Sequence, residues 1–159
     1  MPIIKEYFTK SSIEFELNLN NSKGFIFAKN IPDDLCWIPY NIILTVENEK
    51  YTIDGLAFNL LGLKNFIRKI RYVIDERNIT TEYCEVEYCG GENEFRIKLK
   101  NIEDDFENKR VIIEIWLNGC FIKNYSIGYD IGFRFIAKYE DLKSFLLDLQ
   151  LQLNDLLEL

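Results

Sequence analysis

The chain has 159 residues, a formal net charge of −7 and no histidine. A chain of this length can bury roughly 68–70% of its unfolded surface around a single core, so we expect one domain spanning residues 1–159. The absence of histidine excludes a Ser-His-Asp triad, a Cys-His pair and a His-bearing zinc site. Any catalysis would therefore rest on carboxylates, Lys, Tyr or Cys.

The first residues and the apolar segments bear on localisation. Residues 1–8, "MPIIKEYF", lack the apolar run and cleavage site of a secretory signal. No apolar segment approaches the roughly 20 residues that span a bilayer. We therefore expect a cytoplasmic protein that does not bind membranes. In that compartment the cysteines should be reduced: Cys36, Cys84, Cys89 and Cys120.

The first half of the chain is dominated by alternation of apolar and polar residues, which is typical of half-buried strands. Residues 13–19 predict such a strand, and "GFIFA" at 24–28 is interpreted as its hairpin partner. Further strands are predicted at about 41–47 and 50–54, with a turn between them. No sequence repeat or linker divides the chain.

Two helices are predicted from apolar residues at helical spacing. The first covers roughly residues 60–77 and has a basic outer face formed by Lys64, Arg68 and Arg71. The second covers residues 140–158, with Leu147 and Leu151 outside its main apolar stripe. Five strands are predicted between the helices, near 81–89, 93–101, 110–118, 121–127 and 130–138. The expected fold is α+β, an antiparallel sheet of about eight or nine strands built from hairpins and packed with both helices.

The stretch "TEYCEVEYCGGENEF", residues 81–95, predicts a hairpin connected by residues 90–93. The expected pairs are Cys89–Glu94, Tyr88–Phe95, Val86–Ile97 and Cys84–Leu99, with Glu87–Arg96 and Glu85–Lys98 on the solvent face. Cys84 and Cys89 are an odd number of residues apart and therefore point to opposite faces of a strand. They cannot hold one ion, so we expect no metal and no cofactor.

A second hairpin is predicted at residues 110–127, where Asn118-Gly119 fits a two-residue type I′ turn. One face of this hairpin should be core. The other face would gather Ile112, Trp116, Phe121 and Tyr125 around a single ion pair. Either a helix or second layer covers this face, or Trp116 anchors a partner.

Two acidic segments are candidates for partner binding. In "NIPDDLCWIPY" the carboxylates Asp33 and Asp34 stand beside Trp37, a combination that suits recognition of Arg or Lys, although a structural role or a hard cation is also compatible. In "NIEDDFEN" the carboxylates are Glu103, Asp104, Asp105 and Glu107. This run is either a solvated loop or a patch for a cationic partner.

Residues 82–107 contain nine acids and three bases, a net charge of 3 − 9 = −6. Such a field repels nucleic acid and attracts a basic protein surface. We therefore expect no binding to nucleic acid.

The order of parts resembles the immunity proteins of wall-associated protein A type polymorphic toxins. The resemblance lies in "FELNL", "DDLCWI", "LLGLKNFIRKI", the glutamate-bearing strands after it, and "YEDLKSFLLDLQLQL". Members of that family are small cytosolic proteins without enzymatic activity, which bind and block the toxic domain of a cognate toxin. The resemblance thus implies a non-enzymatic immunity protein whose partner is a toxin domain, and it assigns no binding residue.

Two other classes of function remain open on the residues alone. One is a small enzyme or ligand-binding domain that uses carboxylates and tyrosines in a pocket between sheet and helix. The other is a structural homodimer, paired through the face of Trp116 or through the apolar surface that Leu147 and Leu151 leave on the last helix.

Overall fold

The computed structural model describes residues 1–6, 12–19, 32–75, 85–90, 93–101, 110–125 and 129–157. The strands are β1 (Ile3–Lys5), β2 (Ile13–Leu19), β3 (Trp37–Val46), β4 (Glu49–Asn59), β5 (Glu85–Cys89), β6 (Phe95–Asn101), β7 (Arg110–Leu117) and β8 (Ile131–Lys138). The helices are α1 (Leu60–Ile74) and α2 (Tyr139–Leu157), and a short 3₁₀ turn, η2, spans Gly119–Phe121.

The α+β class, the antiparallel strands and the two helices are confirmed, but the strands among the described residues form two sheets of four. The first sheet has the order β1-β2-β3-β4 and the second the order β5-β6-β7-β8. Each sheet is followed along the chain by a helix, so the arrangement ββββα occurs twice. No repeat is visible in the sequence because the two halves share element order without sharing residue pattern.

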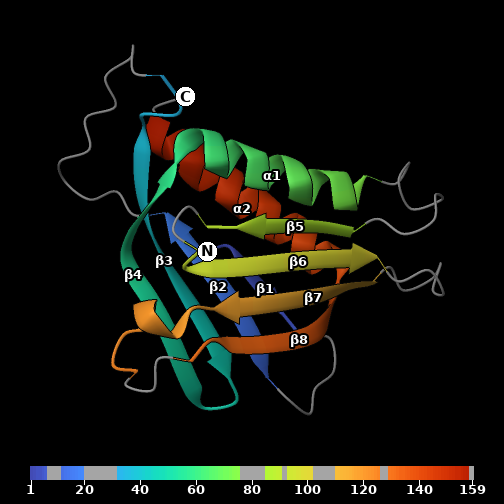
Figure 1. The fold of residues 1–159 in the computed structure, drawn as a ribbon. Helices are drawn as coiled ribbons and strands as arrows, with labels where there is room; N and C mark the ends of the chain where they lie inside the picture. Colours follow the sequence, from blue (N-terminus) through green and yellow to red (C-terminus); the bar gives the residue numbers. More distant parts are fainter. Residues whose placement is uncertain are drawn as a thin grey trace.

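Figure 1 shows the second sheet lying across the first, with both helices on the same side of the molecule. Aromatic contacts tie these layers together. Phe58 of β4 packs against Tyr88 of β5 and Phe95 of β6, with ring centroids 6.0 and 5.9 Å apart. At the other end of β4, Tyr51 lies 6.1 Å from Phe133 of β8. One continuous core therefore runs between the sheets and beneath the helices.

Local signals explain both helices. Asn59 caps α1, because its side chain accepts a hydrogen bond from the Gly62 amide at 2.9 Å. The buried residues of α1 follow helical spacing: Leu60, Leu63, Phe66, Ile67, Ile70 and Val73. In α2, Glu140 and Asp141 occupy the first turn, where negative charge stabilises the helix end. Among the described residues, no helix is long and apolar enough to cross a membrane.

The hairpin of β5 and β6 has the predicted faces but a different register. Cys89 pairs with Arg96, Tyr88 with Ile97 and Glu87 with Lys98. This register is shifted by two residues from the expected one, and a shift of two keeps Glu87, Tyr88 and Cys89 on their predicted faces. The physical reason is that Glu94 leaves the hairpin ladder and turns into the core, where only 2% of it is exposed.

The predicted hairpin at Asn118-Gly119 is wrong. Strand β7 pairs with β8, so that Trp116 lies opposite Gly132 and Leu117 opposite Ile131. The Asn118 side chain accepts a hydrogen bond from the Cys120 amide and starts the turn η2 instead. The chain then crosses to β4, where the Lys123 amide donates a hydrogen bond to the Thr52 carbonyl at 2.8 Å. Phe121 and Tyr125 pack against the core and do not share a face with Trp116.

The first strand prediction, residues 13–19, matches β2. This strand pairs with β1 and β3. The predicted partner at 24–28 lies outside the described residues, and β1 was not expected, because three residues are too few to show alternation.

Candidate functional site

A cluster of exposed apolar side chains lies where residues 32–37 meet the start of α1. Leu35, Trp37 and Leu61 are 63%, 45% and 47% exposed. We call these three residues the loop–helix patch. Exposed hydrophobic side chains are ordinary singly, but several at one place indicate an interaction surface.

Backbone hydrogen bonds hold the patch in place. The Leu60 amide donates to the Cys36 carbonyl at 2.7 Å, and the Leu61 amide donates to the Asp33 carbonyl at 3.3 Å. The Asn59 side chain also donates to the Asp34 carbonyl at 2.6 Å. The segment is therefore fixed against the first turn of α1, and its apolar side chains are presented on a rigid support.

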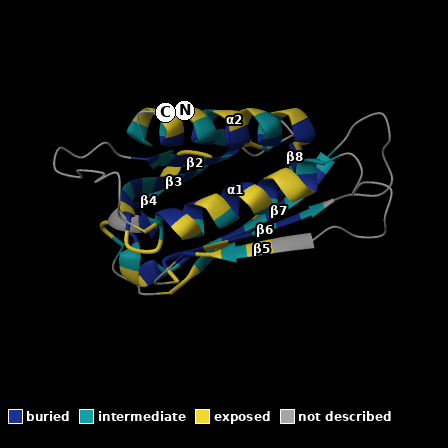
Figure 2. Cartoon of the chain, turned by 90° about the horizontal axis from the view of Figure 1, so that it is seen from above, coloured by how far each residue is buried: buried dark blue, intermediate teal, exposed yellow. Residues whose placement is uncertain are grey.

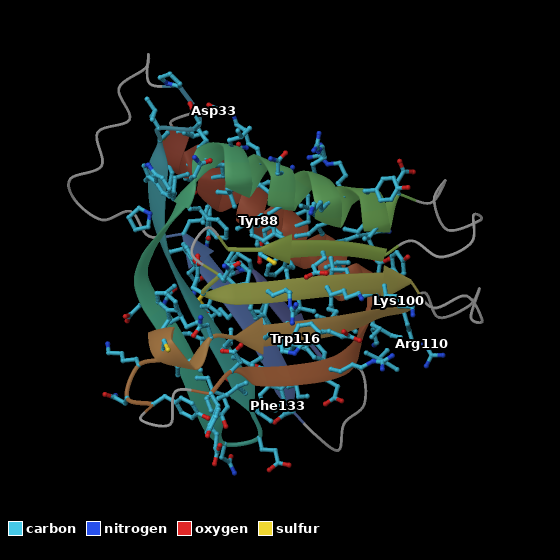
Figure 3. The ribbon with its side chains drawn as sticks, in the orientation of Figure 1. Asp33, Tyr88, Lys100, Arg110, Trp116 and Phe133 are labelled. Atoms are coloured by element: carbon cyan, nitrogen blue, oxygen red, sulfur yellow. The ribbon has the colours of Figure 1, made fainter. Side chains whose placement is uncertain are left out.

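The predicted acids lie at the rim of the loop–helix patch. Asp33 forms an ion pair with Lys64 at 2.5 Å, and Asp34 is exposed. Figure 3 shows Asp33 at the end of the molecule where α1 begins. The structure thus brings Asp33, Asp34 and Trp37 together.

Cys36, between them, is buried, and burial, followed by the negative charge of Asp33, raises the pKa of its thiol. This thiol is therefore a poor nucleophile at neutral pH.

Trp116 lies elsewhere, on the outer face of the second sheet (Figure 3). The Arg96 guanidinium stacks over its ring, 4.4 Å from the centroid. Beneath the ring is Gly132, where an added Cβ would come within 2.7 Å of the Trp116 Cδ1 atom. The tryptophan is therefore held between Arg96 and Gly132 and is half-buried, which makes it a weaker anchor than Trp37.

The outer face of the second sheet carries many bases. Those with described side chains are Arg96, Lys98 and Lys100 on β6, Arg110 on β7, and Arg134 and Lys138 on β8, against Glu87 and Glu114. Ion pairs join Arg96 to Glu87 at 3.7 Å and Arg134 to Glu114 at 3.4 Å. The acidic sum over residues 82–107 therefore does not describe this face. Glu103, Asp104, Asp105 and Glu107 lie outside the described residues, so their prediction as a binding patch stays a prediction.

A buried polar pair was missed by the sequence reasoning. Glu94 is 2% exposed, and one of its carboxylate oxygens accepts a hydrogen bond from the Tyr40 hydroxyl. Tyr88 lies nearby, and burial, followed by the charge of Glu94, raises the pKa of its phenol. The run of residues 90–94 without apolar character gave no signal that one of its acids is buried. Because water and substrates cannot reach this carboxylate, the pair serves to join the hairpin to β3.

Three of the four cysteines have described side chains. Cys36 is buried, whereas Cys89 and Cys120 are exposed. Within the described ranges, no three Cys, Asp or Glu side chains gather in a way that could hold a metal ion. Cys84 lies outside these ranges.

Comparisons with known proteins add no assignment. No protein-family model matches the chain, and no curated protein matches it significantly.

Proposed function

We propose that this chain is a non-enzymatic, cytoplasmic protein that acts by binding another protein, in the manner of an immunity protein that blocks a cognate toxin domain. The observation that carries the proposal is the loop–helix patch, three exposed apolar side chains on a rigid support. Tryptophan and large aliphatic residues surrounded by polar groups are typical of binding anchors.

Charge defines the kind of partner. Asp34 is exposed at the rim of the patch, and Asp33 forms an ion pair with Lys64. A partner surface with an apolar centre and a basic edge would bury Trp37 and pair with these carboxylates. A nuclease-like toxin domain, whose active surface is basic because it binds nucleic acid, has this chemistry.

Binding is favoured over catalysis by the state of the acidic groups. The carboxylate of Glu94 is enclosed in the core with Tyr40, and the chain has no histidine. Exposed carboxylates such as Asp34 are open to solvent and are suited to pairing with a cation of a partner surface.

The test is direct binding between the purified protein and the toxin domain encoded beside its gene, together with growth of cells that express both. We expect a one-to-one complex and protected growth. Trp37→Ala and Leu35→Ala should raise the dissociation rate at least about tenfold, since anchor residues supply most of the binding free energy. Tyr129→Ala is the matched control, because Tyr129 is 73% exposed and lies outside the patch. Turnover of a small molecule by the protein alone would refute the proposal, and so would patch variants that bind like the control.

A further inference from the structure

The two helices leave an open groove of about 560 Å³ between them. One wall carries the basic residues Lys64, Arg68 and Arg71 of α1, and the other carries Leu147 and Leu151 of α2. Both leucines are 60% exposed. Figure 2 looks down on the helices and shows exposed residues along both of them. The groove is thus basic on one side and apolar on the other.

The two helices carry opposite charge. Residues 60–74 contain Lys64, Arg68, Lys69 and Arg71 and no acid, a net charge of +4. Residues 139–157 contain four acids, Glu140, Asp141, Asp148 and Asp155, and one base, Lys143, a net charge of 1 − 4 = −3. The basic wall of the groove and the acidic helix α2 are therefore complementary in charge.

Helix α2 has the features of a segment that would fit this groove. Leu147 and Leu151 are four residues apart, so they form a continuous apolar ridge on its outer side. Asp148 and Asp155 stand three residues before and four residues after Leu151, which places acids beside the ridge. Among the residues that the structure describes, Asp148 pairs with the exposed N-terminal ammonium group at 3.3 Å, an interaction of little strength.

From this complementarity we propose that the groove binds α2 of a second copy of this chain, giving a two-fold dimer through the helical face. In a two-fold interface, α2 of each copy meets α1 of the other, so the charge match is made twice. The ridge of Leu147 and Leu151 fills the apolar side of the groove. The acids beside the ridge, Asp148 and Asp155, lie toward Arg68 and Arg71 of the other copy. Neither arginine forms an ion pair with any residue that the structure describes.

The dimer can be tested separately from the proposed toxin binding, because Arg68, Arg71, Leu147 and Leu151 lie outside the loop–helix patch. Its test needs only the purified chain. Sedimentation velocity from micromolar to submillimolar concentration should show a reversible monomer–dimer equilibrium. Leu147→Ala with Leu151→Ala should raise the dissociation constant at least about tenfold, whereas Tyr129→Ala should not change it. A wild-type protein that stays monomeric, or leucine variants that dimerise like the control, would overturn the proposal.

Charge exchange tests the arrangement of the helices. One variant carries Arg68→Glu and Arg71→Glu, and the other carries Asp148→Lys and Asp155→Lys. Each variant alone places like charges across both helix contacts and should be monomeric. Mixed together, the two variants restore opposite charges at both contacts and should form a heterodimer. All four positions are on the surface, and far-ultraviolet circular dichroism checks that each variant is folded. If the mixture stays monomeric, the pairing of α1 with α2 is wrong.

Discussion

The hydroxyl of Tyr40 on β3 donates a hydrogen bond to the carboxylate of Glu94, 54 residues later in the chain. This contact joins the two sheets at the connection between β5 and β6. In this contact Glu94 lies outside the ladder between β5 and β6, which agrees with the shifted register of the hairpin. A carboxylate in the core is costly unless it is hydrogen-bonded, so this pair must form for the sheets to pack as they do.

Removal of the Tyr40 hydroxyl should therefore weaken the fold. We expect Tyr40→Phe to lower the free energy of unfolding by about 1–3 kcal/mol, since it leaves a buried acceptor with one donor fewer. Urea denaturation measures the change, with Tyr129→Phe as the exposed control. In a double-mutant cycle with Glu94→Gln the two changes should not add. Additive losses would show that the hydrogen bond does not couple the two sheets.

Gly90 should be intolerant of a side chain for a related reason. A Cβ atom at this position would lie 2.4 Å from the carboxyl carbon of Glu94. We expect Gly90→Ala to lower the free energy of unfolding by about 1–3 kcal/mol, as overpacking does. In a Glu94→Ala background the same change should cost much less, because the clash is gone. Equal costs in the two backgrounds would show that the clash is not the cause.

The fold should lose stability in alkali through Tyr88. Burial and the charge of Glu94 raise the pKa of its phenol above the ordinary value of about 10. The stability that the neutral phenol contributes is fully present below about pH 10 and is lost as the pH rises toward the folded-state pKa. Urea midpoints should therefore fall above about pH 10, and Tyr88→Phe should flatten this fall. Tyr51→Phe provides a comparison with Tyr88→Phe. The pKa of the Tyr51 phenol is also raised, but by a hydrogen bond to Glu49, and this phenol is more exposed than that of Tyr88.

Leu149 should be a residue of the central core. It is fully buried on the inner side of α2. Leu149→Ala should lower the free energy of unfolding by about 2–5 kcal/mol, the usual cost of a buried leucine. Leu147→Ala on the outer side of the same helix, measured in dilute solution, should change it by less than about 0.5 kcal/mol. Similar losses at the two positions would mean that the inner and outer sides of α2 have been assigned incorrectly.

The acidic run from Glu103 to Glu107 should govern how fast the proposed toxin domain associates. Charge reversal at Asp104 and Asp105 should slow association much more than it speeds dissociation, because long-range attraction between opposite charges acts mainly on the rate of encounter. The effect should shrink in high salt, since the Debye length is already about 8 Å at physiological ionic strength. Stopped-flow or biolayer measurements at two salt concentrations separate these rates. An unchanged association rate at low salt would move the contact to Asp33, Asp34 and Trp37 alone.

Local pattern was sufficient for most of the secondary structure. The alternation at residues 13–19 and 110–117, the helical spacing after Asn59 and the acidic first turn of α2 are properties of neighbouring residues, and the structure has these elements where the sequence predicts them. The faces of the residues with described side chains in β5 and β6 were also predictable, because a period of two does not depend on which partner strand is chosen. The grouping of Asp33 and Asp34 with Trp37 followed from their proximity in sequence.

Contacts between residues distant in the sequence decided the features that neighbouring residues do not specify. The register of β5 with β6 depends on Tyr40, which is distant in the sequence, and the choice of β8 as the partner of β7 depends on the crossing of residues 119–125 to β4. The division into two sheets depends on where the chain lies after α1, and no local sequence signal specifies that position. Trp116 was expected in an aromatic cluster, but it is held between Arg96 and Gly132. The reason is that β7 pairs with β8, which comes later in the chain than the predicted hairpin strand. Exposure of Leu35 and Leu61 beside Trp37 likewise arises only when the loop docks on the first turn of α1.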